Sequence, residues 1–433
     1  MSGKLEVRLS QYLLGPSAAQ GAVATVYPLE SGSEASRQTF VISAGSGEAR
    51  LVEVPAGRYL VEARLPSGET VAKEVEVGEG GHEPVDLQGK GSDHEWLSWQ
   101  RLVGNVGRGA AAVSGVEAPT AGGPEEARAG DAAPPMAGLP VARWIADPAD
   151  PLRGDRNSAD AWELLAKAID VTSRTVLGHL APRGAKRMEA SDGDRDHQLY
   201  RLCGDGAAPS SQPIRDQGSP LPRRYLLVES RDWIELVCAP VPWYNQATSE
   251  QSVVEVLVRA APAHGEAASA TALRDSDFGA ALSYMTIGAL SEARQIYEQA
   301  RDMLFGKVVN PLAAAGGGYV LLGTDPAGEA ADWPDWIENL RTWFPWLPDG
   351  SIQAGWLKLK RRRDQADVDD ARAAFHEAVQ RGLPFYSMGI QRLVEGLTMF
   401  EGDPETDRLL AQVQSVAWHA NLQQPFTTLR LKG

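Results

Sequence analysis

The chain has 433 residues, too many for one ordinary hydrophobic core, so two or three domains are expected. Its 57 acidic and 42 basic residues give a formal net charge of -15, and such an acidic surface disfavours general nucleic-acid binding. The sequence lacks a long apolar run, a signal-like start and a CxxC pair between its two cysteines, so we expect a cytoplasmic protein without membrane span, disulfide scaffold or structural zinc.

Residues 1–90 contain short runs rich in β-branched residues, in which apolar and polar side chains alternate and between which Gly, Pro and Ser cluster. In RYLVEARLP, for example, Tyr59, Val61, Ala63 and Leu65 point to one face, as in a half-buried strand. About six such strands at a spacing of about ten residues predict a small antiparallel β-sandwich.

The stretch VEVPAGRYLVEARLPSGETVAKEVEVGEG resembles the closing strands of transthyretin-like and carboxypeptidase-regulatory-like sandwich modules. Those modules combine an apolar strand, a Pro-x-Gly-x-Tyr turn and further strands, and the resemblance implies a non-catalytic accessory module. The residues agree with a non-catalytic module, because no histidine precedes His82 and no pattern of carboxylates predicts a shared acidic site.

Residues 91–142 begin with a predicted short helix, HEWLSWQRLV, and continue as a segment dominated by Ala, Gly and Pro. Such a segment cannot bury enough apolar surface to offset the entropy lost on ordering, so we predict a flexible, disordered linker. Arg108 and Arg128 would be its exposed trypsin sites, and a partner peptidase that cuts there is a speculative extension.

Residues 143–270 combine a helix with strands and predict a small α+β middle unit. Ser158 is a suitable N-cap for SADAWELLAKAIDV, in which apolar residues such as Trp162 and Leu165 recur on one face. The predicted strands follow at 225–228, 233–241 and 253–258.

An acidic loop in this middle unit begins like a calcium-binding loop, with Asp192, Asp194 and Asp196. An EF-hand then needs glycine and glutamate at positions that hold His197 and Cys203. We therefore expect a solvated loop and no metal.

The two cysteines suggest the other chemical possibility, a hydrolase of the cysteine-peptidase kind, in which Cys203 or Cys238 pairs with His179 or His197. The flanking sequences GHL and LVCAP lack the features of caspase-like peptidases, and Cys238 lies in an apolar strand where an inert buried thiol is expected. GxSxG, HExxH and P-loop motifs do not occur. We assign no catalytic, cofactor-binding or metal-binding residue.

In residues 271–433 the apolar residues recur with the period of a helix, and we expect this part to fold alone. AALSYMTIGALSEARQIYEQARDMLFGK predicts two helices, with Gly288 at the end of the first and Ser291 capping the second. The spacing resembles that of tetratricopeptide (TPR) hairpins, because the positions of the TPR pattern are matched by Tyr284, Ala293, Tyr297 and Ala300, and its second half again by Ala371, Phe375 and Ala378. The two units are not spaced by a multiple of the repeat, so the resemblance implies TPR-like hairpins without a regular array.

The segment NPLAAAGGGYVLLGTD, residues 310–325, comes nearest to a cofactor motif. Asn310 is a good N-cap, and Pro311 suits the first turn of a helix. A helix rather than a strand is expected before it, and no GK[ST] follows, so we predict a helix of small residues instead of a phosphate-binding loop. Gly317 is then expected to allow close helix packing.

Two further stretches are expected to be structural. In residues 332–350, Trp336, Leu340 and Trp343 share a predicted helix face and should pack between hairpins. The basic run 358–363 precedes DQADVDD, which predicts a self-neutralised helix end rather than a nucleic-acid contact. His376 and His419 lack carboxylate neighbours at metal-ligand spacing.

The predicted fold class is multidomain α+β: an N-terminal antiparallel β-sandwich, a flexible linker, a small α+β middle unit and C-terminal all-α TPR-like helical hairpins. This architecture favours a non-catalytic interaction or adaptor protein that binds a protein or peptide partner, and neither nucleic acid nor membrane. The alternative is the hydrolase, which requires His197, Cys203 and Cys238 to converge in a cleft.

Overall fold

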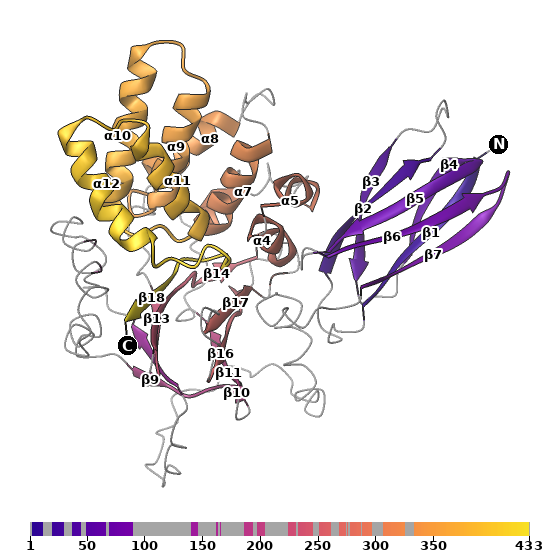
Figure 1. Cartoon of the computed structure of the whole chain (residues 1–433), viewed down its shortest axis with the longest axis horizontal. Helices are drawn as coiled ribbons and strands as arrows, with labels where there is room; N and C mark the ends of the chain where they lie inside the picture. Colours follow the sequence, from indigo (N-terminus) through magenta and orange to yellow (C-terminus); the bar gives the residue numbers. More distant parts are fainter. Residues whose placement is uncertain are drawn as a thin grey trace, which may run out of the picture.

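The computed structural model describes residues 2–11, 20–29, 37–44, 49–65, 69–89, 140–145, 162, 165, 186–193, 197–203, 224–230, 233–245, 251–260, 268–273, 275, 278–286, 288–296, 306–324 and 333–432. Figure 1 displays a β-rich N-terminal part, a middle part built mainly from strands and a C-terminal part dominated by helices. The predicted mixture of α and β structure is therefore confirmed. Among the described residues, no helix is long and apolar enough to cross a membrane.

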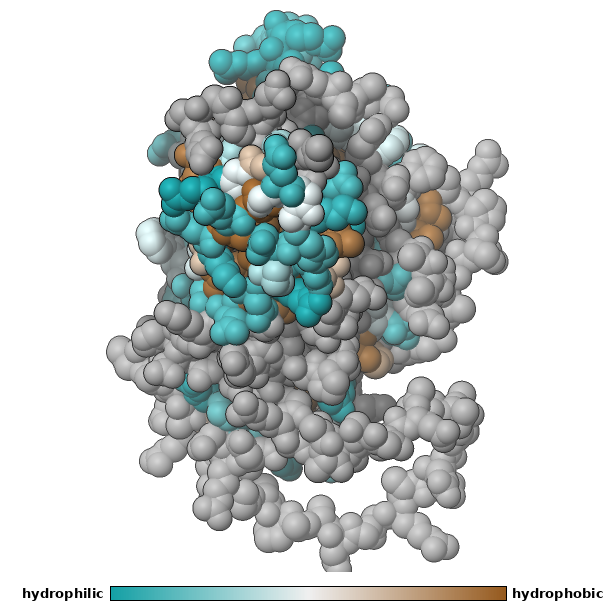
Figure 2. All heavy atoms as spheres, turned by 90° about the vertical axis from the view of Figure 1, so that its right-hand side faces the viewer, coloured by the Kyte–Doolittle hydropathy of each residue, from teal (hydrophilic) through white to brown (hydrophobic). Residues whose placement is uncertain are grey.

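The N-terminal part consists of two sheets that share one hydrophobic core. The sheets have the strand orders β4-β1-β7 and β3-β2-β5-β6. Successive side chains of a strand point to opposite faces, and those on one face enter the core. In β5, for example, Tyr59, Val61 and Ala63 are buried between more exposed neighbours. Seen from the end of the molecule that these strands form, the described surface is mainly hydrophilic with scattered hydrophobic residues (Figure 2). The strands are β1 (Ser2–Gln11), β2 (Gln20–Pro28), β3 (Gln38–Ala44), β4 (Arg50–Pro55), β5 (Gly57–Arg64), β6 (Thr70–Val77) and β7 (His82–Gly89).

One strand pair departs from the expected antiparallel arrangement. β1 and β7 run parallel, from Lys4 beside His82 to Gln11 beside Gly89. After β6 the chain passes to the other sheet through a tight turn in which Gly80 has a φ of 65°. This change of sheet lets β7 lie beside β1 in the same direction, because strands β2 to β6 separate the two in the chain. The prediction of an antiparallel fold was wrong for this pair.

The predicted short helix and linker lie outside the described residues up to residue 139. Strand β8 begins at Val141 and is the first described element of the middle part.

In the middle part, two larger sheets collect strands from distant positions in the chain. Their orders are β18-β13-β12-β8-β9 and β10-β11-β16-β17, and β14 pairs with β15. Trp162 and Leu165 are helical and fully buried, as expected, whereas the rest of their predicted helix lies outside the described residues. The strands are β8 (Val141–Ile145), β9 (Lys186–Met188), β10 (Asp192–Gly193), β11 (His197–Leu202), β12 (Arg224–Glu229), β13 (Trp233–Ala239), β14 (Trp243–Tyr244), β15 (Gln251–Ser252), β16 (Val254–Arg259), β17 (Ser269–Leu273) and β18 (Thr428–Lys432).

The C-terminal part is helical, and aspartates mark where two of its helices begin. Asp364 accepts a hydrogen bond from the Asp367 N–H before α10, and Asp403 accepts one from the Thr406 N–H before α12. The helices are α4 (Gly279–Thr286), α5 (Leu290–Ile296), the 3₁₀ turn η3 (Gly306–Val308), α7 (Pro311–Thr324), α8 (Trp333–Trp343), α9 (Pro348–Lys360), α10 (Gln365–Arg381), α11 (Ser387–Thr398) and α12 (Pro404–Ala417).

The glycine-rich segment forms the helix α7, as predicted, and Asn310 caps it by accepting from the Ala313 N–H at 2.9 Å. Its glycines allow other groups to approach the backbone. A Cβ added at Gly316 would lie 2.4 Å from a ring carbon of Phe278, and one at Gly318 would lie 2.1 Å from Oε1 of Gln353. The glycine run therefore allows close packing, and the two close approaches lie at the neighbours of Gly317, the glycine for which such packing was predicted.

The helical part and the middle part share one hydrophobic core and one sheet. β18 follows the last helix and pairs with β13, with Leu429 beside Leu236 and Leu431 beside Ile234. A boundary between residues 270 and 271 would cut through β17. These pairings argue against independent folding of residues 271–433.

Candidate functional site

The residues of the hydrolase hypothesis lie apart. His197 begins β11 and Cys203 directly follows its end, so about 20 Å of extended strand separates them. Cys238 is buried in β13, in the other sheet. Burial raises the pKa of the Cys203 thiol, which makes that residue a weaker nucleophile at neutral pH. This geometry offers no support for a Cys–His pair of His197 and Cys203, and His179 lies outside the described residues.

The positions considered for metal binding do not form a ligand set in the described ranges. No group of three or more His, Cys, Asp or Glu side chains there is suited to hold an ion. His376 in α10 instead shares a hydrogen bond of 2.8 Å with the Thr406 hydroxyl. Asp194 and Asp196, in the loop that begins like an EF-hand, lie outside the described residues.

The helix α8 has a wider buried face than the one predicted. Trp333, Ile337 and Leu340 are buried in the core, and Trp336 and Trp343 are partly buried against it and also contact Lys307. The Lys307 ammonium lies 5.9 Å and 4.7 Å from the centroids of these two rings, and burial lowers its pKa. The tryptophans thus hold a cation of the chain itself.

Two of the five basic residues in the run at the end of α9 pair with acids of the following DQADVDD segment, in line with the prediction. Lys358 pairs with Asp370 at 3.3 Å, and Arg363 pairs with Asp367 at 3.5 Å. Lys360 donates to the Leu322 carbonyl near the end of α7.

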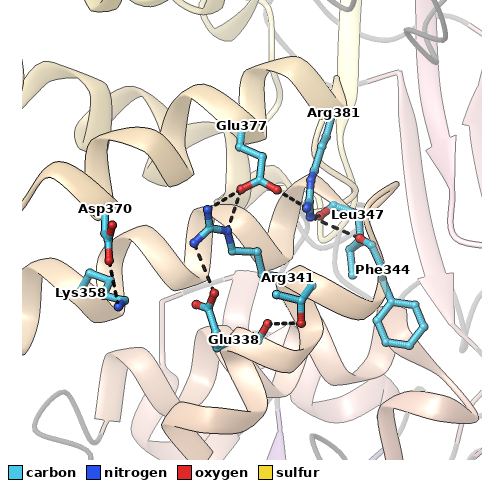
Figure 3. Close-up of polar contacts among 9 residues, drawn as sticks. Glu338, Arg341, Phe344, Leu347, Lys358, Asp370, Glu377 and Arg381 are labelled. Carbon is cyan, nitrogen blue, oxygen red and sulfur yellow. Dashed lines mark hydrogen bonds and ion pairs between the residues drawn. The ribbon is translucent and has the colours of Figure 1, made fainter. Parts of the chain in front are cut away.

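A network of charges fastens α8 to α10 (Figure 3). Arg341 reaches the Glu377 carboxylate at 2.6 Å, and Arg381 pairs with the same carboxylate. Arg381 also donates to the carbonyls of Phe344 and Leu347, which follow the end of α8, at 3.3 and 3.1 Å. All these groups have partners, so the network is structural.

The best candidate site in the described part of the chain is a cleft of about 240 Å³ formed by three separate segments. They are the α4–α5 hairpin, the start of α11 and the loop before β18. Its walls are mainly apolar, with Leu282, Met285, Leu290, Met388, Leu422 and Pro425. The remaining lining residues are Thr286, Gly288, Tyr386, Gln391, Arg392 and Gln424.

Polar groups lie at defined positions in this cleft. Gln424 is 2% exposed, and its Oε1 accepts from the Thr271 N–H at 3.0 Å, which fixes the amide plane. In the described structure the Gln424 NH2 group has no acceptor, so it is available to an occupant. Gln391 and Arg392 both donate to Glu395 at 2.8 Å. The Gln424 amide therefore offers a fixed hydrogen-bond donor among mainly apolar walls.

Two exposed hydrophobic side chains lie in or shortly before the loop that lines the cleft. Leu422, part of its wall, is 47% exposed, and Trp418, four positions earlier, is 85% exposed. Exposed tryptophans are costly to keep in water and are enriched among residues that dominate protein interfaces. Sequence reasoning missed this site because its segments are far apart in the chain and carry no motif.

Comparisons with known proteins give one partial match. No curated protein and no solved structure matches the chain significantly. A family model described as the Y4kD C-terminal domain matches residues 280–430. The match begins within α4 and ends within β18, so it includes every lining residue of the cleft and leaves the N-terminal part outside. The C-terminal part of this chain is therefore similar to the Y4kD C-terminal domain.

Proposed function

We propose that this protein is a non-catalytic interaction protein whose cleft between the α4–α5 hairpin, α11 and the 422–425 loop binds a segment of a partner protein. The observation that carries the proposal is the small apolar cleft with the exposed Leu422 in its wall, together with the exposed Trp418 four positions earlier in the chain.

The dimensions of the cleft favour a protein segment over a small metabolite. Small-molecule pockets usually enclose about 300–1,000 Å³, whereas this cleft holds about 240 Å³. That space suits one or two apolar side chains, and Met285 and Met388 have flexible thioethers that adapt to them. The Gln424 NH2 group can donate to a backbone carbonyl of the same segment. The occupant is therefore an extended partner segment that inserts an apolar side chain.

The other parts fit an adaptor of this kind. We infer that the α4–α5 pair and the pair that ends in α10 belong to a TPR-like scaffold, and that the two N-terminal sheets form a sandwich-like accessory module. The cysteine usage suits a reducing cytoplasm.

The test is photo-crosslinking in the native cell from residue 388, followed by measurement of Kd with the identified partner. Trp418→Asp and Leu422→Asp should each weaken binding by about 30-fold, as expected for residues worth about 2 kcal/mol. Both side chains are exposed, so the fold should persist.

Met399→Asp is the matched control, because Met399 is 56% exposed but lies at the opposite end of α11 from the cleft. It should bind like the unmodified protein. Equal affinities for all three variants would refute the proposal.

A further inference from the structure

The N-terminal sheets contact the helical part through the hydroxyl of Tyr284 in α4. This tyrosine is fully buried. Its hydroxyl accepts from the Val23 N–H at 3.2 Å and donates to the Arg64 carbonyl. Val23 and Arg64 are opposite each other at the end of the β2–β5 ladder. One side chain of the helical part thus bridges two strands of the N-terminal part.

Two further contacts strengthen this docking. The Arg64 guanidinium pairs with Glu292 of α5 at 2.9 Å, and the Glu292 side chain is 18% exposed. The Val23 side chain is 4% exposed and belongs to the core of the helical and middle parts rather than to that of its own sheets. In Figure 1, α4 and α5 lie between the N-terminal sheets and the other helices.

The same hairpin forms one wall of the cleft. Leu282, Met285 and Leu290 line it, whereas Tyr284 and Glu292 face the N-terminal sheets. α4 has eight residues, and a helix this short is not stable alone in water. Its position therefore depends on what packs against both of its faces.

The start of the hairpin is fixed independently of the N-terminal part. Asp275 accepts from the Phe278 N–H and from Trp243 Nε1, both at 3.0 Å, and so holds the first turn of α4 on the middle part. The end of α4, the Gly288 turn and α5 lie beyond this anchor. They are the elements whose order should depend on docking.

We propose that docking of the N-terminal sheets on the α4–α5 hairpin holds the cleft in its binding shape. This inference rests on the proposed function. Because coupling between two binding events is reciprocal, a partner in the cleft also strengthens docking.

The test uses full-length protein and hydrogen exchange followed by mass spectrometry, without any partner. Arg64→Glu places two carboxylates together, and Val23→Asp places a charge in an apolar interface. Each should raise amide exchange in residues 282–290 by about 5-fold or more, equivalent to about 1 kcal/mol. Adding Glu292→Arg to Arg64→Glu should restore slow exchange.

Arg58→Glu is the matched control, because Arg58 pairs with Glu74 within the N-terminal sheets. It should leave residues 282–290 unchanged. The coupling is refuted if exchange rises in β2 and β5 of both undocking variants but not in residues 282–290, or if neither variant changes exchange anywhere.

The result of the exchange experiment can be distinguished from the result of the partner-binding experiment. Exchange in residues 282–290 needs no partner, whereas Trp418→Asp and Leu422→Asp leave the docking contacts intact. Normal partner binding by those two variants, together with faster exchange in Arg64→Glu, would remove the proposed partner site and keep the dependence of the hairpin on docking.

Discussion

Gly316 in α7 gives the sharpest test of the packing described above. A Gly→Ala change inside a helix gains about 1 kcal/mol in helix propensity. At Gly316 the new methyl group would lie 2.4 Å from one ring carbon of Phe278 and 2.9 Å from the Tyr386 hydroxyl.

Neither neighbour can move away easily. Phe278 is fully buried, with the Trp243 ring centroid 4.7 Å from its own, and the Tyr386 hydroxyl donates to the Leu312 carbonyl at 2.6 Å. The cost should therefore reach the upper end of overpacking, about 3 kcal/mol. Gly316→Ala should lower the free energy of unfolding by about 2 kcal/mol.

Urea unfolding followed by tryptophan fluorescence measures this loss, because residues 1–90 contain no tryptophan and do not contribute. Gly323→Ala is the control in the same helix. There the methyl group would meet Cδ1 of Leu290 at 2.2 Å, the far end of a side chain that can rotate. Its effect should stay within about 0.5 kcal/mol. A Gly316→Ala protein as stable as the unmodified one would refute the reasoning.

Three further predictions follow from the core and its charges. Burial raises the pKa of Glu235, whose carboxylate accepts from Ser269 Oγ at 2.6 Å and from the Ala268 N–H. The stability that this pKa shift contributes is complete below the unfolded pKa of about 4.3 and is lost as pH rises through the folded pKa. Glu235→Gln should therefore raise Tm at neutral pH but not near pH 4. A rise in Tm that is the same at both pH values in a thermal scan would contradict this. Arg381→Met should cost about 2 kcal/mol in urea unfolding, because it removes a charged donor from two carbonyls and one of the two cations beside Glu377. Arg372→Met, with more exposed ion pairs, should cost less than about 1 kcal/mol, and equal costs would argue against the network. A fragment of residues 271–433 should lack a cooperative thermal transition in circular dichroism, because β18 would lack β13, and a sharp transition would restore the predicted independent domain.

The sequence was most informative where structure is determined locally. Asn310 and Pro311 identify the start of α7 from adjacent positions, because a cap and a first turn need only neighbouring residues. The alternation in β5 likewise identifies its buried face. Gly288 was correctly expected at the end of α4, where it has a φ of 72°.

Features that depend on distant pairing could not be predicted. The segment TLRLK was not identified as a strand, and its partner β13 precedes every helix from α4 to α12 in the chain. The contact of Trp336 and Trp343 with Lys307 could not be predicted either, because that lysine comes from another segment of the chain. The cleft combines three segments, none of which carries a chemical signature by itself.

The pairing of β13 with β18 also has a consequence for synthesis on the ribosome. β13 emerges early, whereas β18 emerges only after every helix from α4 to α12 has been made. Until then one edge of β13, rich in buried apolar residues, has no strand beside it and can pair with other chains. The nascent protein therefore passes through a long aggregation-prone stage, and holdase chaperones that cover apolar strands should increase its yield.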